Sequence, residues 1–403
     1  MISGRHPGGN SEEVPHEVPH VVPHGDPPIT GVATSVTAFL GRTADGPLGR
    51  AHRCRSHADF LRTFRGPHPS SDLADSVRLF FENGGSECHV VRLGSSARRG
   101  DDGAPPELAD YRGSAADGTG FHALDAVDLF NLLVLPRDRD IPEADFLRIL
   151  GAASTCCKRN RAMLLIDAPR SWTRRGQAVV DRRAVDGLRE LVVPDHAALF
   201  YPDLVCGDRG LTRTIGPSGA IAGLMARIDA GRGVWKAPAG LDASLLGVRG
   251  LEVELTDVQN GVLNPLAVNC LRVRPTGVVN WGARTLAGAD GIGPEWRFIP
   301  VRRLALFLEA SLERGTRWVA TEPNEAPLWA RIRLAVGAFM HGLFRQGAFQ
   351  GDAPDRAYYV RCDGTTTTSQ DRDRGIVNIE VGFAPLRPAE FIAIRIRQRA
   401  GEP

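Results

Sequence analysis

VVNWGARTL at residues 278–286 and FIAIRI at residues 391–396 enclose the stretch of sequence that decides the fold. Two helical patterns lie between them, followed by two runs in which apolar and polar residues alternate. Alternation with a period of two predicts strands that are buried on one face. No catalytic constellation occurs anywhere in this stretch. The C-terminal part therefore predicts a compact α/β domain that ends in a strand hairpin, and it favours assembly over chemistry.

The apolar spacing places the helices and strands of this part. Helices are predicted over 300–315 and 324–346, since each has apolar residues three or four apart and a glycine at its end. Strands are predicted around 377–383 and 392–396, with one apolar face made of Val377, Ile379, Val381, Ile392, Ile394 and Ile396. An exposed apolar strand near a chain end aggregates unless something pairs with it. We expect this strand pair to close its own sheet or to dock on another subunit.

The preceding part of the sequence alternates strands and helices. Short apolar runs without alternation, which are typical of strands buried on both faces, occur at 34–40, 87–93, 131–135, 162–166 and 197–201. Helical patterns separate or follow them at 72–83, 142–158, 181–192 and 217–230. This order predicts an α/β layer. The fold class is therefore α/β, or mixed α+β, in two α/β domains.

A chain of 403 residues suits two domains with extensions. Residues 1–28 repeat Pro-His every four residues and predict an extended N-terminal arm. We expect an outer α/β domain over 29–276 with an exposed loop at 98–120, an inner α/β domain over 277–384, and a C-terminal arm strand within 385–403.

Composition excludes several classes of function. Lys and Arg number 49 and Asp and Glu 47, so a formal charge of +2 predicts neither a nucleic acid partner nor an anionic membrane partner. The seven cysteines form no Cys-x-x-Cys pair, which favours reduced, buried thiols over a zinc site or a disulfide framework. Neither a secretory leader nor an 18-residue apolar run is apparent. We expect a soluble protein made in the cytoplasm, without membrane insertion.

Motifs for enzymatic chemistry are weak. Neither Lys158 nor Lys236 lies in a glycine-rich phosphate-binding loop. Ser218 lies in GPSGA, which resembles a nucleophile elbow, but Ala220 replaces the second glycine. We therefore predict that Ser218 caps a helix, and we expect no catalytic residue and no cofactor.

Metal binding has a simpler alternative at each candidate. Asp363, Asp371 and Asp373 could gather a divalent ion, but a solvated turn explains them better. The Pro-His repeat could form a metal tract, yet an extended chain does not bring its histidines together without a turn; these are His16, His20 and His24. We expect no metal site. The charged run at 137–140 is predicted to be a solvated loop.

A basic flank is predicted on the 324–346 helix. Arg331, Arg333 and Arg345 lie outside its apolar stripe. They could meet an acidic partner or simply face solvent.

Many short motifs together resemble the tail sheath proteins of contractile phages and related contractile injection particles. From about residue 29 to the end they follow the order of that family, and they include TGVATSVTAFLG (30–41), FFENGG (80–85), PSGA (217–220), GVWKAP (233–238), WGARTL (281–286), VRRL (301–304), EPN (322–324), VRCD (360–363) and PAEF (388–391). The Pro-His repeat departs from the strand with which the family often begins. That departure leaves the register of the N-terminal arm open.

The resemblance implies a structural role. Sheath subunits form hexameric rings that stack helically around an inner tube protein, and their contraction drives the tube through a target envelope. Their arms add strands to neighbouring subunits. Here Val14 and Val18 would belong to the N-terminal arm. The six apolar residues of the predicted strand pair would belong to the C-terminal arm. Arg331, Arg333 and Arg345 would face the tube. Further partners would be baseplate and cap or terminator proteins, in a phage tail or tail-like particle that is assembled in the bacterial cytoplasm and can be released.

Two other functions stay open. One is an α/β enzyme, such as a hydrolase, whose site is too dispersed to recognise. The other is a cap or baseplate relative of sheath proteins that does not contract. A sheath forms long lattices, whereas an enzyme stays a small oligomer with a ligand pocket and a cap forms closed rings.

Overall fold

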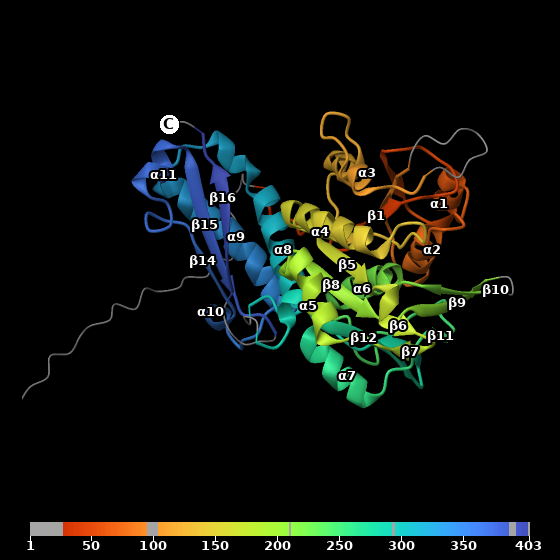
Figure 1. Cartoon of the computed structure of the whole chain (residues 1–403). Helices are drawn as coiled ribbons and strands as arrows, with labels where there is room; N and C mark the ends of the chain where they lie inside the picture. Colours follow the sequence, from red (N-terminus) through yellow and green to blue (C-terminus); the bar gives the residue numbers. More distant parts are fainter. Residues whose placement is uncertain (1–26, 95–103, 209–210, 292–294, 387–391, 402–403) are drawn as a thin grey trace, which may run out of the picture. The chain divides into compact units, whose positions relative to one another are not determined.

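The computed structural model describes residues 27–94, 104–208, 211–291, 295–386 and 392–401 (Figure 1). Contacts divide the chain into two compact units. The larger one contains Gly31–Ser311, and the smaller one contains Leu312–Pro385 and the C-terminal strand. The arm residues Val14 and Val18 and the histidines of the Pro-His repeat lie outside the described residues.

An eight-stranded sheet forms the larger unit, in the order β13-β12-β8-β5-β4-β1-β3-β2. The six inner strands run parallel, and β2 and β13 are antiparallel at the two edges. The strands are β1 (Thr37–Gly41), β2 (Ala51–Cys54), β3 (Cys88–Arg92), β4 (Leu132–Val134), β5 (Met163–Asp167), β8 (Ala197–Tyr201), β12 (Val268–Arg274) and β13 (Gly277–Asn280).

Helices cover both faces of this sheet, because its inner strands carry apolar residues on both sides. Phe39 of β1 packs into one core, while its neighbours Ala38 and Leu40 pack into the other. The first core includes residues of α1 (His57–Phe64), α2 (Leu73–Glu82) and α6 (Ser218–Arg232). The second includes residues of α3 (Leu108–Arg112), α4 (Glu143–Arg159) and α5 (Arg182–Leu191). The larger unit is therefore a three-layer α/β fold.

Short elements complete the larger unit. A second sheet has the order β10-β9-β11, and a hairpin joins β6 to β7. Their bounds, with those of α7, are β6 (Thr173–Arg174), β7 (Gln177–Ala178), β9 (Leu204–Asp208), β10 (Leu211–Ile215), β11 (Gly250–Leu251) and α7 (Asp257–Leu263). Most of these are too short to show a clear periodicity in the sequence.

The predicted exposed loop at 98–120 is corrected in part, because α3 lies within it; residues 98–103 lie outside the described residues, and most of 104–120 is exposed or half-buried. In this helix Tyr111 is fully buried, and Glu107 and Asp110 form a capping box at its start. A five-residue helix carries too few apolar positions to stand out in a Gly- and Asp-rich stretch.

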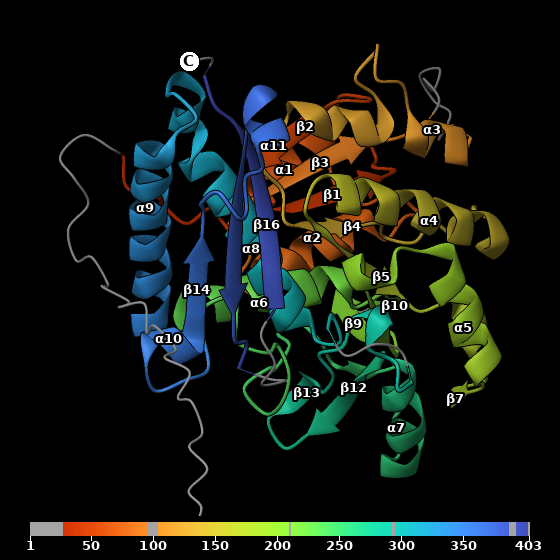
Figure 2. The ribbon, with the colours of Figure 1, turned by 90° about the vertical axis from the view of Figure 1, so that its left-hand side faces the viewer.

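The smaller unit contains α9 (Ala326–Arg345) and an antiparallel sheet in the order β14-β15-β16 (Figure 2). Its strands are β14 (Tyr358–Arg361), β15 (Ile376–Phe383) and β16 (Ile392–Arg399). The short helices α10 (Pro354–Ala357) and α11 (Ser369–Asp373) precede β14 and β15. One face of α9 packs on β14.

The contact division differs from the domain boundary that we predicted at 277. Residues 277–311 group with the larger unit, because β13 pairs with β12 in the large sheet. The chain passes between the units inside α8 (Ile299–Gly315). The predicted mixed α/β fold is confirmed, as are the main helices and strands. No helix of the described ranges is long and apolar enough to cross a membrane.

Candidate functional site

The β14-β15-β16 sheet has one apolar face. In β15, Val377, Ile379 and Val381 are fully buried, and the same face of β16 consists of Ile392, Ile394 and Ile396, each 4% exposed. The two strands are in register, with Val381 opposite Ile394 and Ile379 opposite Ile396. The sequence predicted this strand pair, and the structure closes it within one chain. Its inter-subunit role stays a prediction.

The opposite face of this sheet is cationic. Glu380 of β15 lies between Arg361 of β14 and Arg395 of β16, with N–O distances of 3.8 and 3.2 Å. The two arginine side chains are 63% and 81% exposed, so these ion pairs contribute little to stability. Burial, and then the Glu380 carboxylate, raise the pKa of Tyr359, whose hydroxyl donates to Glu380 at 3.2 Å. Arg397 is also exposed here.

The outer edge of β16 presents backbone donors. The Ala400 N–H donates to the carbonyl of Gly375 at 2.7 Å, on the β15 side. N–H groups alternate in direction along a strand, so those of residues 393, 395, 397 and 399 point away from β15. The Gly401 N–H follows this alternation, since it points away from β15 and donates to the backbone carbonyl of Glu322. Among the described strands none pairs with residues 392–399 on this side, although Gly401, just beyond β16, forms a bridge with Pro323 there. The edge of β16 itself is therefore available to a further strand.

The predicted tube-facing arginines do not share one flank of α9. Each residue of a helix turns by about 100°, so Arg333 lies about 200° from Arg331. Arg331 pairs with Glu322 at 2.8 Å and stacks over the Trp318 ring at 4.8 Å. The Arg333 guanidinium donates to the Cys362 carbonyl.

Arg345 lies near the C-terminal end of α9 and is exposed. It is thus more accessible than Arg331, which is about one-third exposed. Of the three arginines, Arg345 remains the best candidate for an external contact.

The acidic turn before β15 is structural. Asp363 accepts hydrogen bonds from Thr365 and Thr366, and Asp371 accepts from Thr368 at the start of α11. Hydrogen bonds from the threonine side chains are the main cause that lowers the pKa of both carboxyls. In the part of the chain that the structure describes, no group of three or more His, Cys, Asp or Glu side chains is placed to hold a metal ion.

A buried charge network lies at the carboxyl ends of the parallel strands in the larger unit. Arg137 pairs with Asp203 and donates to the Ala168 carbonyl at 3.0 Å. Asp138 pairs with Arg42, which follows β1, and both side chains are almost fully buried. Our prediction of a solvated loop at 137–140 was therefore wrong for Arg137 and Asp138, whereas Arg139 and Asp140 are exposed. The run follows β4 closely, and this position places its first two residues under the neighbouring loops rather than in solvent.

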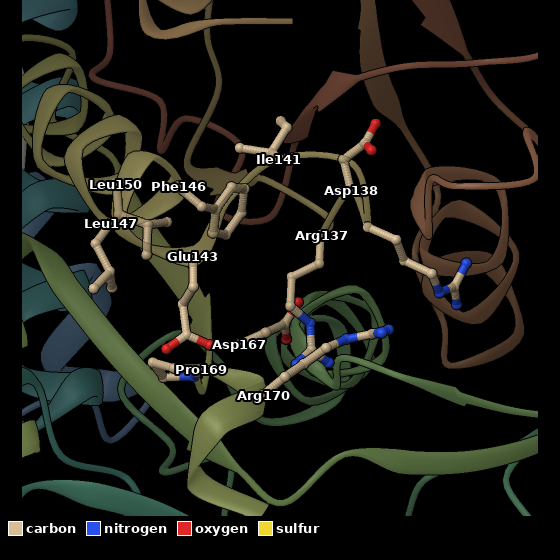
Figure 3. A pocket seen from close by; sticks show the side chains of 11 residues that line it. Arg137, Asp138, Ile141, Glu143, Phe146, Leu147, Leu150, Asp167, Pro169 and Arg170 are labelled. Atoms are coloured by element: carbon tan, nitrogen blue, oxygen red, sulfur yellow. The ribbon is translucent and has the colours of Figure 1, made fainter. Parts of the chain in front are cut away.

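A cavity of about 100 Å³ opens beside this network. Figure 3 shows Phe146, Leu147 and Leu150 of α4 on one side of it, with Arg137 and Arg170 on the other. Open α/β sheets bind ligands at the carboxyl ends of their strands, but ligand pockets usually enclose about 300–1,000 Å³. The space is thus small for a substrate, and its charged side chains are largely paired with residues outside its lining, such as Asp203, Arg42 and Asp72.

The start of α6 is held by Asp167, at the end of β5. The backbone N–H and the hydroxyl of Ser218 donate to the two Asp167 oxygens at 2.7 and 2.9 Å. The N-cap is Pro217, so the prediction that Ser218 caps the helix is corrected: the cap comes from another strand. Only the tertiary fold brings Asp167 to this helix end.

Asp167 makes the stability of the larger unit depend on pH. Burial raises the pKa of its carboxyl from 3.8 to about 6, against the lowering effect of Arg137. A carboxyl whose pKa is raised by folding favours the native state below the unfolded pKa and loses that advantage as pH rises through the folded pKa. The free energy of unfolding should therefore fall between about pH 4 and pH 6, by about 3 kcal/mol from this group.

Asp167→Asn removes the titration and keeps an oxygen that accepts a hydrogen bond from Ser218. Urea denaturation at several pH values gives the unfolding free energy of the wild type and of the variant. We expect the value of the wild type minus that of the variant to fall as the pH rises from about 4 to about 6. A difference that does not change with pH would contradict the assignment.

Comparison with known proteins agrees with this architecture. Residues 293–399 match the family model of the phage tail sheath C-terminal domain. The chain carries a tail sheath C-terminal domain. Its fold is also that of sheath proteins. No curated protein sequence matches significantly.

The similarity to sheath structures extends over nearly the whole chain. The sheath complex of an extracellular contractile injection system, PVC, in its contracted state is 27% identical, with 98% of both chains covered and a TM-score of 0.70. The contracted helical sheath of the anti-feeding prophage (AFP) is 29% identical, covering 96% of this chain and 99% of that one, with a TM-score of 0.68.

A chain of the AFP baseplate structure is equally similar. It is 29% identical, covers 98% of this chain and 99% of its own, and has a TM-score of 0.69. This sheath-like chain is thus a relative of structural components of contractile injection systems and phage tail-like particles. Its relatives are structural proteins rather than enzymes.

Proposed function

We propose that this sheath-like chain is the subunit of a contractile sheath. Six copies form a ring, the rings stack around an inner tube, and the stack shortens to drive the tube through a target envelope. The observation that carries this proposal is the similarity to two contracted sheaths over 96–98% of the chain. The sheath is assembled in the bacterial cytoplasm, and its subunit turns over no substrate.

Subunits are joined through the β14-β15-β16 sheet. The outer edge of β16 carries a row of outward N–H groups, which suits the addition of a strand from a second copy. The predicted N-terminal arm, with Val14 and Val18, is our candidate for that strand. Contraction is driven by the additional interface that forms between subunits, because burial of apolar surface contributes roughly 25 cal/mol per Å².

Assembly of the purified chain tests the proposal. Negative-stain electron microscopy at increasing protein concentration should show long, striated, hollow cylinders. A preparation that stays in small particles at every concentration, and that fails to form cylinders when inner tube protein is added, would contradict a sheath subunit.

Arg345 is our candidate for the contact with the inner tube protein. We expect Arg345→Glu to reduce co-sedimentation with the tube severalfold while sheath-only polymers still form, since the side chain is exposed. Arg356→Glu is the matched control, because Arg356 is also exposed, at 70%, and the charge change is the same. Failure of the sheath-only polymers in Arg345→Glu would assign this arginine to a contact between sheath subunits.

A second candidate is a baseplate or cap relative that does not contract. The specific observation in its favour is the 29% identity to a chain in the AFP baseplate structure. Such a protein forms closed rings. The microscopy distinguishes the two functions, because rings that do not stack at high concentration, even with the tube present, favour the cap or baseplate function.

A further inference from the structure

Two cysteines face each other at one edge of the large sheet. β2 is the edge strand and pairs antiparallel with β3, with Cys54 directly opposite Cys88. Figure 2 shows the two strands side by side. Directly opposite residues of an antiparallel pair place their side chains on the same face. Both thiols are fully buried in the same apolar core.

The backbone distance suits a disulfide. Opposite residues in an antiparallel ladder have Cα atoms about 4.5 or 5.5 Å apart, depending on the hydrogen-bonding pattern. Both values fall within the range of about 4.4–6.8 Å that disulfides require. Both thiols are free and buried. Oxidation would therefore need little movement of either strand.

We propose that Cys54 and Cys88 form a reversible disulfide bond under mild oxidation by a peroxide, which joins the edge strand β2 covalently to β3. The bond would close a loop over residues 55–87, which contains α1 and α2. A reducing cytoplasm keeps such thiols reduced, whereas surroundings outside the cell favour the disulfide. The sheet edge would thus be strengthened after a particle is released.

The two thiols differ in their surroundings, and this difference indicates which of them reacts first with the oxidant. The neighbouring Cys88 thiol lowers the pKa of Cys54, whereas burial raises the pKa of Cys88. The thiolate is the nucleophile in thiol oxidation. Cys54 also lies at the end of the edge strand β2, whereas Cys88 lies on the inner strand β3. Cys54 is therefore the thiol that is oxidised first, and Cys88 is the resolving thiol.

The oxidation is balanced with hydrogen peroxide as the oxidant. The Cys54 thiolate attacks one peroxide oxygen, the O–O bond breaks, and hydroxide leaves, which yields the sulfenic acid of Cys54. The Cys88 sulfur then attacks the Cys54 sulfur, the S–O bond breaks, and hydroxide leaves again. Protons from the two thiols convert the hydroxides to water, so two thiols and one peroxide give one disulfide and two water molecules.

Access to the buried thiols comes from opening of the edge strand. Cys54 is the last residue of the four-residue strand β2, which has ladder hydrogen bonds on one side only among the described strands. Edge segments open locally far more often than the whole domain unfolds. A small oxidant such as peroxide can then reach both sulfurs, since they share one face.

Peptide mapping of the full chain tests this proposal. The folded protein is treated with hydrogen peroxide at low concentration, free thiols are alkylated, and the chain is digested with trypsin without reduction. We expect residues 54–55 to be linked to residues 79–92, with the loss of two hydrogen masses, and the link to disappear after reduction. Amide hydrogen exchange of β2 should slow at least severalfold in the oxidised form.

Variants separate this pair from the other five cysteines. Cys88→Ser and Cys54→Ser should each abolish the link, while Cys270→Ser, at a buried cysteine of β12, should leave it unchanged. The wild-type map decides the question even if a variant does not fold. Links between other cysteines, oxidation of Cys54 beyond the sulfenic acid without a link, or no reaction at peroxide levels that oxidise N-acetylcysteine would each overturn the proposal.

Discussion

Arg397→Pro should abolish the formation of sheath cylinders. The Arg397 N–H points away from β15, as the hydrogen bond of Ala400 to Gly375 and the alternation along β16 indicate. Proline removes this outward donor and introduces a ring that obstructs a further strand, yet it is tolerated at an edge strand whose N–H faces solvent. The subunit should therefore fold, with a circular dichroism spectrum close to that of the wild type, and fail to polymerise.

Arg397→Ala is the matched control for this experiment. It removes the same exposed side chain and keeps the outward N–H. We expect it to form cylinders at about the concentration that the wild type needs, as seen by electron microscopy and by sedimentation. Cylinders formed equally well by Arg397→Pro would show that subunits do not join through this edge. If both variants fail, the guanidinium rather than the backbone carries the contact.

Asp229→Ala should destabilise the larger unit by about 3–5 kcal/mol, because it leaves a buried cation without its partner. Arg303 of α8 binds both oxygens of Asp229, at the end of α6, with distances of 3.0 and 2.6 Å. The two side chains are only 4% and 5% exposed. The Thr34 hydroxyl also donates to Asp229, at 2.7 Å, so the pair joins two helices to the segment before β1.

Denaturant unfolding measures this loss of stability. Asp242→Ala is the control, since Asp242 is 77% exposed and lies 3.9 Å from Arg232; we expect it to change stability by less than about 0.5 kcal/mol. The double variant Asp229→Leu with Arg303→Met should recover much of the loss, because it buries no unpaired charge. Equal effects of Asp229→Ala and Asp242→Ala would mean that the ion pair is not buried in solution.

Three features of this protein could not be predicted from its sequence because they depend on distant residues. The run at 137–140 has the composition of a solvated loop, but its first two residues are buried with partners as far away in sequence as Arg42 and Asp203. Ser218 has the context of a helix cap, but Asp167 supplies the cap from another strand. The arginines of α9 flank its buried stripe on two sides, and contacts with Glu322 and Cys362, both outside the helix, determine which of them are bound within the unit.

The sequence by itself determined the elements with strong periodicity and the family resemblance. The helices of 300–315 and 324–346 and the alternating strands β15 and β16 are visible in it, because one-sided burial imposes a period of 3.6 or 2 on the chain. Only the tertiary structure decided that β13 joins the large sheet, that charges are buried beside β4, and that β16 exposes its outer edge. Strand order and the pairing of charges depend on contacts between residues far apart in the sequence, and the local sequence pattern does not predict such contacts.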